Sequence, residues 1–136
     1  MPRKPSASQP DTSGKAETTG DLSPAFDRLR KAAEGLPGIE EGISYGTPAL
    51  RVGKKLLCRV KNADTAVVMV DLKEKEILMA AAPDIYFETG HYKGWPCFLV
   101  HVHDIEPREL AHRLERAWQR LAPKKLLKMR GKPAAR

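Results

Sequence analysis

The chain has 136 residues and a formal net charge of +7, with 41% hydrophobic and 30% charged residues, which fits one globular domain with a single core. No stretch contains the roughly 20 apolar residues that a membrane-spanning helix needs. Since the amino terminus also lacks the pattern of a secretory signal peptide, we expect a cytoplasmic protein that has no membrane partner.

The two ends of the chain differ in composition from the middle. Residues 1–20 are rich in Pro, Ser, Thr, Gly and Lys and hold too few apolar side chains to offset the entropy of ordering them, so we expect a disordered tail. Residues 124–136 contain six basic and no acidic side chains and are expected to form a basic tail. Residues 21–123, the expected domain, carry no net charge, so the basic balance belongs mainly to the carboxy-terminal tail.

The first expected helix begins at Ser23, an N-cap residue type, with Pro24 at the first helical position. Apolar residues follow at helical spacing until the glycines of residues 35–38 end the segment. Polar side chains fill the opposite face, so this helix is predicted to pack one apolar stripe against a flat surface.

Three strand-like runs come next, at residues 48–53, 55–61 and 65–70, and turn residues separate them. They predict an antiparallel meander, with a shorter extended piece ahead of it at residues 39–45. Alternation in the second run places Leu56, Cys58 and Val60 on one face and Leu57, Arg59 and Lys61 on the other.

A short second helix is expected after Asp71, which begins a capping-box pattern, and Pro83 ends it. Two further strands are predicted at residues 84–88 and 97–103, joined by a loop at residues 89–96. This loop combines an imidazole, a lysine and two aromatic rings between glycines, which is the most distinctive stretch of the chain.

The last long helix opens at Glu106-Pro107 and ends before Pro123, with Leu110, Leu114 and Trp118 on its buried stripe. The element order is therefore α-β(3)-α-β(2)-α. It predicts an α+β fold, a two-layer sandwich in which helices cover one face of a curved antiparallel sheet.

The two cysteines, Cys58 and Cys97, each lie inside an apolar strand and show no metal-knuckle or disulfide spacing. We interpret both as buried thiols. The alternative is a redox pair or a nucleophile.

Several segments resemble the MmcQ/YjbR-like family: Gly46-Thr47-Pro48-Ala49, Val52-Gly53-Lys54, His91-Tyr92-Lys93-Gly94-Trp95-Pro96, and the closing helix with Trp118 and Ala122-Pro123-Lys124. The resemblance covers about residues 22–126. It implies a curved sheet open on one side, similar to the double-wing DNA-binding domain of a phage transcription factor and to frataxin-like and secretion-chaperone-like sandwiches. It also implies DNA binding, and it brings no established set of catalytic residues.

The open sheet face is the first candidate binding surface. If the helices cover the apolar face, then Arg51, Arg59, Lys61, His101 and His103 project from the opposite one. Lysine and arginine contacts to phosphates supply affinity for DNA that does not depend on base sequence. The alternative is an ordinary solvated face on which these side chains pair with acids such as Glu88.

Wing-like tips and the basic tail would extend this surface. Lys54 and Lys55 lie at one predicted hairpin tip and Lys93 in the long loop, while Tyr92 could stack on bases. We therefore predict a non-catalytic DNA-binding protein. The candidate nucleic-acid-binding residues are Arg51, Lys54, Lys55, Arg59, Lys61, His91, Tyr92, Lys93, Lys124, Lys125, Lys128 and Arg130.

A second interpretation is a protein-interaction or chaperone-like domain that holds a partner peptide through Leu57, Leu99, Tyr92 and Trp95. Tyr92 and Trp95 could instead stack on bases or a planar ligand, but for Trp95 we favour a structural role as a plug at the sheet edge.

A third interpretation, a ligand or metal site at His91, His101 and His103, is kept because the last two histidines are predicted to point the same way from one strand. No ligand pair with characteristic spacing accompanies them, so we predict no metal and no cofactor. The chain also contains no nucleophile elbow, phosphate-binding loop or dinucleotide-binding turn, and we do not expect an enzyme.

Overall fold

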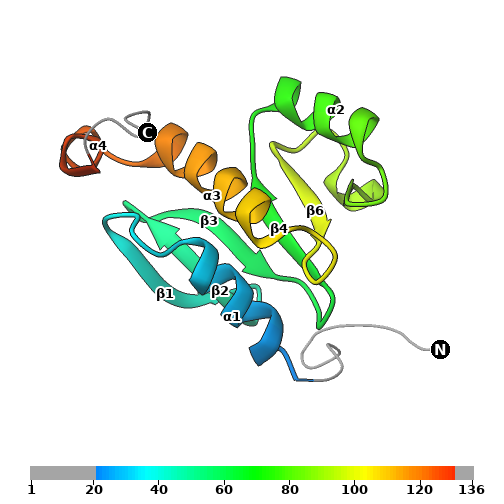
Figure 1. Cartoon of the computed structure of the whole chain (residues 1–136), viewed down its shortest axis with the longest axis horizontal. Helices are drawn as coiled ribbons and strands as arrows, with labels where there is room; N and C mark the ends of the chain where they lie inside the picture. The colour runs from blue at the N-terminus through cyan, green and yellow to red at the C-terminus, as the bar shows by residue number, and fades with distance from the viewer. Residues whose placement is uncertain (1–20, 131–136) are drawn as a thin grey trace.

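The computed structural model describes residues 21–130. The expected tail at residues 1–20 and residues 131–136 of the basic tail lie outside this range. No helix within it is long and apolar enough to cross a membrane. In chain order the elements are α1 Ser23–Ala32, β1 Ile39–Ser44, β2 Thr47–Val52, β3 Lys55–Val60, β4 Thr65–Met69, α2 Leu72–Ala81, β5 Tyr86–Phe87, the 3-10 helix η2 Gly90–Tyr92, β6 Cys97–His101, α3 Pro107–Leu121 and α4 Lys124–Arg130 (Figure 1).

The strands form one antiparallel sheet in the order β1-β2-β3-β4-β6-β5, which confirms the predicted α+β class. The meander has four strands where three were predicted, because the piece ahead of it pairs with β2 along its whole length. The sequence pattern did not indicate a full strand here, because β1 is an edge strand and four of its six residues are exposed. The predicted strands at 84–88 and 97–103 are also shorter, at Tyr86–Phe87 and Cys97–His101.

The helix starts are only partly as predicted. Asp71 caps α2, and its Oδ1 accepts hydrogen bonds from the backbone nitrogens of Lys73 (2.9 Å) and Glu74 (3.0 Å). Ser23 does not cap α1, because it is already the first helical residue. Instead Asp21 Oδ1 accepts from the Ser23 backbone nitrogen at 2.9 Å, so the side-chain acceptor lies two residues earlier than predicted.

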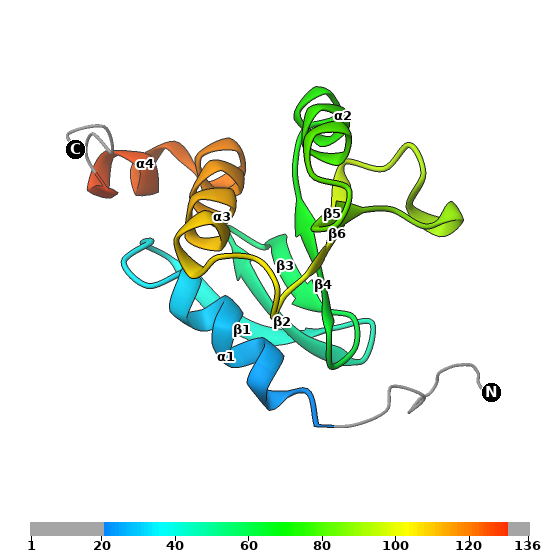
Figure 2. The same cartoon turned by 45° about the vertical axis from the view of Figure 1, so that its right-hand side comes forward.

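The main core lies between the sheet and the helices α1 and α3, which run side by side on one face of the sheet (Figure 2). Trp118 of α3 is 1% exposed, and its indole nitrogen donates to the carbonyl oxygen of Pro37 at 2.9 Å. This bond ties α3 to the segment between α1 and β1. Helix α2 lies beside β5 and β6, where Leu78 and Met79 pack against the edge of the same core.

A β-bulge in β3 reverses part of the predicted alternation. Leu50 of β2 pairs with Cys58, but the next residue, Arg51, pairs with Leu56, so Leu57 is the extra residue. Leu57 is fully buried in the main core, whereas it was predicted on the opposite face. Leu56, predicted in the core, is the partner of Arg51 instead.

Both cysteines are buried, as predicted. Cys58 lies in the main core, and burial raises its pKa. Cys97 belongs to a second, small cluster with Val67 and Leu99 on the opposite face of the sheet, and burial raises its pKa as well. A thiol with a raised pKa is a poor nucleophile, so the geometry favours the structural interpretation of both residues.

Candidate functional site

The predicted binding residues do not form one surface. The structure divides them among the end of the molecule at α4, the open face of the sheet, and the loop that contains η2 (Figure 1). These three places differ in how far their cations are exposed and in what they contact.

The end of the molecule at α4 is built by two close approaches to glycine. Pro123, which precedes α4, packs on Gly53 in the turn between β2 and β3, and a Cβ on Gly53 would lie 2.8 Å from the Pro123 Cδ atom. Leu126 packs on Gly38 in the same way, and a Cβ placed there would collide with the Leu126 Cδ1 atom. Both glycines have positive φ angles, +57° and +77°, which glycine adopts without strain. The turn of β2–β3 and α4 are therefore held next to each other.

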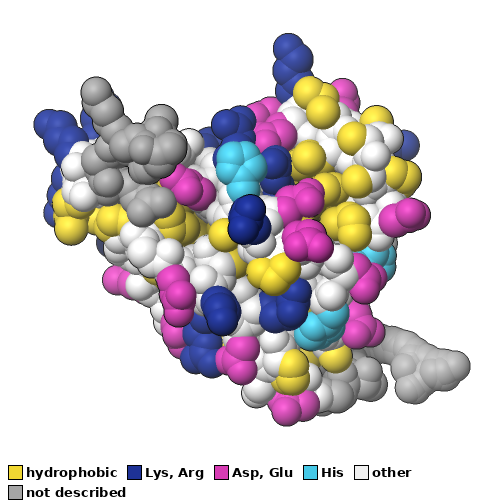
Figure 3. Space-filling model, viewed as in Figure 1, with side chains coloured by type: hydrophobic (Ala, Val, Ile, Leu, Met, Phe, Trp, Pro, Cys, Tyr) yellow, Lys and Arg dark blue, Asp and Glu magenta, His cyan; other side chains and the backbone are white. Residues whose placement is uncertain are grey.

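This contact brings together five lysines that lie in two distant segments of the sequence. All five are exposed, and α4 has no acidic residue. None takes part in the ion pairs formed within residues 21–130. Basic side chains are visible at this end of the molecule in Figure 3. We call this surface the basic end, and it consists of Lys54, Lys55, Lys124, Lys125 and Lys128. Arg130, also predicted to bind, is the last residue of α4.

Arg59 on the open face is not available in the way that was predicted. It is only 9% exposed. Its Nη2 donates to the Tyr92 hydroxyl at 2.8 Å and its Nη1 to Thr47 Oγ1 at 3.1 Å, while the Tyr45 ring lies 5.0 Å from its guanidinium carbon. The two tyrosines reach it from the loop of η2 and from the β1–β2 turn, so segments distant in sequence enclose it.

The other cations of this face are half-buried. Burial lowers the pKa of Lys61, and the neighbouring positive charge of Arg59 lowers it further. Arg51 is paired across the sheet with Glu40 of β1, which puts an acid beside it. The open face is thus less basic toward solvent than the alternation of residues predicted.

The loop of residues 88–96 is anchored by Lys75, which the sequence analysis did not identify. Lys75 of α2 is 2% exposed; its Nζ donates to the carbonyl oxygens of Tyr92 and Trp95, both at 2.9 Å, and lies 2.8 Å from Glu88 Oε1. All three of its protons therefore have acceptors. The sequence did contain one indication that Lys75 faces the core. Lys75 lies three positions before Leu78, so the two side chains share one face of the helix.

Side chains of this loop differ in exposure. His91 and Lys93 are exposed, but on a loop beside α2 and outside the basic end. Tyr92 packs on the second cluster, above Val67 and Leu99. Trp95 is 61% exposed, so the prediction that it plugs the sheet edge is wrong. Lys75 holds the backbone carbonyl oxygen of Trp95, but the indole ring itself is not buried.

The peptide groove that was considered does not form from its predicted residues. Leu57 and Leu99 are 0% and 1% exposed, Tyr92 is half-buried, and only Trp95 of the four presents most of its surface. The leucines fill cores on opposite faces of the sheet, since the bulge turns Leu57 away from Leu99.

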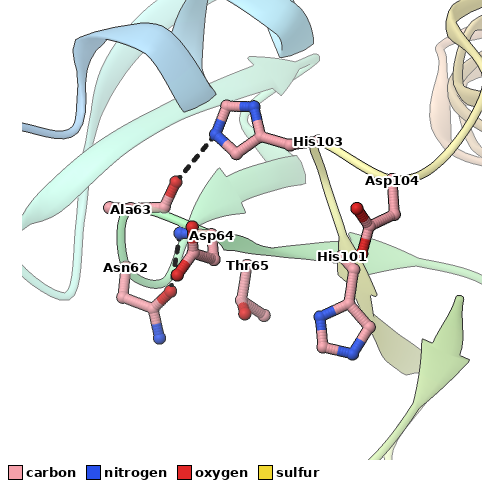
Figure 4. Close-up of a pocket in the computed structure, with 7 residues that line it drawn as sticks. All are labelled: Asn62, Ala63, Asp64, Thr65, His101, His103 and Asp104. Carbon is pink, nitrogen blue, oxygen red and sulfur yellow. Dashed lines mark hydrogen bonds between the residues drawn. The ribbon is translucent and has the colours of Figure 1, made fainter. Parts of the chain in front are cut away.

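The predicted histidine pair does not converge. Strand β6 ends at His101, whose ring stacks on Phe87 with the centroids 4.4 Å apart. His103 lies in the following turn, where its Nε2 is 3.0 Å from the carbonyl oxygen of Ala63. Figure 4 shows the two rings pointing apart from each other around a shallow pocket. Within residues 21–130 no group of three or more His, Cys, Asp or Glu side chains is arranged to hold a metal ion.

Comparisons with known proteins find uncharacterised relatives. A family model described as YjbR matches residues 34–120. An uncharacterized protein of Mycobacterium bovis and uncharacterized proteins of two Mycobacterium tuberculosis strains are each 42% identical over 53 residues, which is 39% of this chain and 41% of the relative. The chain therefore aligns with less than half the length of these curated relatives. No solved structure matches it.

Proposed function

Because the chain belongs to the YjbR family, whose model matches residues 34–120, we propose that it is a non-catalytic DNA-binding protein that contacts the phosphate backbone. The observation that carries this proposal is the basic end, where five exposed lysines from two distant segments share one surface. The proposal places the protein in the cytoplasm, and its two free, buried cysteines suit such a reducing compartment.

The chemistry of the basic end favours backbone contacts over base reading. DNA carries one negative charge per roughly 1.7 Å of helix axis, and each lysine that neutralises a phosphate releases condensed counterions. Lysine acts as a mobile point charge, without the planar fork by which arginine reads guanine. Binding should therefore be sensitive to salt and tolerant of sequence.

The proposed interface is smaller than the sequence predicted. Lys54 and Lys55 act as one wing-like tip, and α4 extends that tip. Lys93 lies in the loop beside α2 instead of beside α4, and Arg59 is committed to Thr47 and Tyr92. We assign the main contacts to the basic end alone.

The test is fluorescence anisotropy with a DNA duplex across a salt series from about 50 to 200 mM, a range over which phosphate-directed binding weakens strongly. The triple variant Lys54→Ala/Lys55→Ala/Lys125→Ala removes three charges from the basic end. If each lysine neutralises one phosphate, the slope of log affinity against log salt becomes shallower by about 2.7, at about 0.9 per contact.

A matched control removes the same charge from elsewhere. Lys31, Lys73 and Arg108 are exposed on α1, α2 and α3, so Lys31→Ala/Lys73→Ala/Arg108→Ala should leave the slope within one contact of the parent value. If the slope became shallower by the same amount in both triple variants, DNA binding would depend only on the net charge of the protein. The absence of binding by the parent protein at low salt would overturn the proposal.

A further inference from the structure

A second cationic site lies on the open face of the sheet, away from the basic end. Arg59 is 9% exposed, yet its partners within residues 21–130 are all neutral: Thr47 Oγ1, the carbonyl oxygen of Val60 and the Tyr92 hydroxyl. None of the ion pairs in that range uses it. A guanidinium this deeply enclosed is normally compensated by a carboxylate or another anion.

Arg59 keeps hydrogen-bonding capacity that points beyond its protein partners. The guanidinium has five N–H groups, and its Nε forms no hydrogen bond with residues 21–130. This atom is not completely enclosed by the protein, so it keeps a hydrogen-bonding position for a ligand. The Tyr92 hydroxyl accepts from Arg59 and still has its own proton to donate.

Lys61 supplies a second positive charge to the same place. It follows Arg59 by two residues, and its backbone nitrogen continues the pairing with β4 by donating to the Thr65 carbonyl oxygen at 2.8 Å, which keeps the two side chains on one face. Its ammonium forms no ion pair or hydrogen bond with the described part of the chain, residues 21–130. The Arg59 charge helps to lower the Lys61 pKa, as expected for two cations with no anion between them.

An exposed aromatic ring borders these cations. Tyr45 is 86% exposed, with one face of its ring 5.0 Å from the Arg59 guanidinium carbon. Its backbone φ is +52°, an uncommon conformation for a residue other than glycine, and it holds the side chain in the turn between β1 and β2. The outer face of the ring is free to stack on a planar group.

We propose that this face of the sheet binds the phosphate group of a small phosphomonoester, held by Arg59 Nε, the Lys61 ammonium and the Tyr92 hydroxyl. A phosphomonoester carries about 1.5 to 2 negative charges at neutral pH, which matches two cations better than a single carboxylate does. Tyr45 would stack on the planar part of the molecule, as in a nucleoside monophosphate. The site is separate from the basic end and does not depend on DNA binding.

The test is an NMR titration of the full chain at constant ionic strength, using adenosine 5′-monophosphate, inorganic phosphate, acetate and adenosine as probes. The monophosphate should give saturable shifts at the Arg59 Nε–H and at the backbone amides of Lys61 and Tyr92. Inorganic phosphate should give the same shifts more weakly. Phosphate binding as strong as that of the monophosphate would contradict the stacking role of Tyr45.

Two matched substitutions locate the site. Lys61→Met keeps the apolar stem of the side chain and removes its charge, and the monophosphate affinity should fall about tenfold. Lys31→Met makes the same change at an exposed lysine of α1, outside both cationic surfaces, and should leave that affinity unchanged. If the parent protein shows no saturable shifts with either phosphate compound, or if both methionine variants bind equally, the proposed site is wrong.

Discussion

The basic end and the open face both contain cations, but these cations differ in how far they are exposed to solvent. On the basic end, five lysines are exposed and form no ion pair within residues 21–130. On the open face, Arg59 is enclosed between Thr47, Tyr92 and Tyr45, and Lys61 is half-buried. The number of basic residues on a strand therefore does not show how many of them a DNA phosphate backbone can contact.

Buried and exposed cations also differ in what they contribute to stability. An exposed lysine without a partner contributes little to the free energy of unfolding, because solvent already satisfies it. A buried cation holds other groups in place, and its removal leaves those groups unsatisfied.

The largest effect is expected at Lys75. Lys75→Met keeps the apolar stem of the side chain but leaves the carbonyl oxygens of Tyr92 and Trp95, and the Glu88 carboxylate, without their donor. Loss of one partner from a buried ion pair costs about 3 kcal/mol. Urea unfolding should show this decrease in the free energy of unfolding.

A nearby lysine on α2 provides the control for Lys75→Met. Lys73 is exposed on the same helix, and Lys73→Met should change the free energy of unfolding by no more than about 0.5 kcal/mol. A small effect of Lys75→Met would mean that water satisfies the loop of residues 88–96, and the distinction between buried and exposed cations would fail there.

An intermediate effect is expected at Gly53, which holds the basic end together. Gly53→Ala forces a non-glycine residue to φ +57° and brings its Cβ to 2.8 Å from Pro123 Cδ. We expect a loss of about 2 kcal/mol, of which roughly half comes from the backbone conformation. DNA affinity should fall too, because α4 is displaced from the β2–β3 turn.

Gly46→Ala isolates the backbone contribution. Gly46 has φ +81°, but a Cβ there would meet nothing within 4 Å, so only the conformational cost of about 1 kcal/mol should remain. Its DNA affinity should stay at the parent value. If Gly46→Ala weakens DNA binding as much as Gly53→Ala does, the contact of Pro123 with the turn does not organise the basic end.

Sequence patterns predicted the elements whose signals are local. The Asp71 cap, the buried stripe of α3 with Trp118, and the two buried cysteines follow from spacing and residue type, and the structure confirms them. Strand β1 was underestimated because an edge strand need not bury either face, so its polar composition resembles a loop.

The features that were missed depend on contacts between distant segments. The bulge at Leu57 breaks the period-2 alternation, and nothing in the run of residues 55–61 indicates it, because leucines occupy both candidate core positions. Lys75 was missed because its acceptors are backbone carbonyl oxygens 17 and 20 residues away, which carry no side-chain signature. The docking of Pro123 on Gly53 likewise joins segments that only the fold brings together.

The smallest predicted effect tests whether the open face really encloses its cation. Tyr92→Phe keeps the ring on the cluster of Val67 and Leu99 but removes the oxygen that accepts from Arg59. Because Arg59 is charged and mostly buried, we expect a loss of about 1 kcal/mol in the free energy of unfolding. Tyr45→Phe is the matched control, since it retains the ring beside the guanidinium and should change stability by less than about 0.5 kcal/mol. Both effects are measured by urea unfolding. Equal effects of the two substitutions would mean that water replaces the Tyr92 hydroxyl freely, and that the contact with Tyr92 does not enclose Arg59.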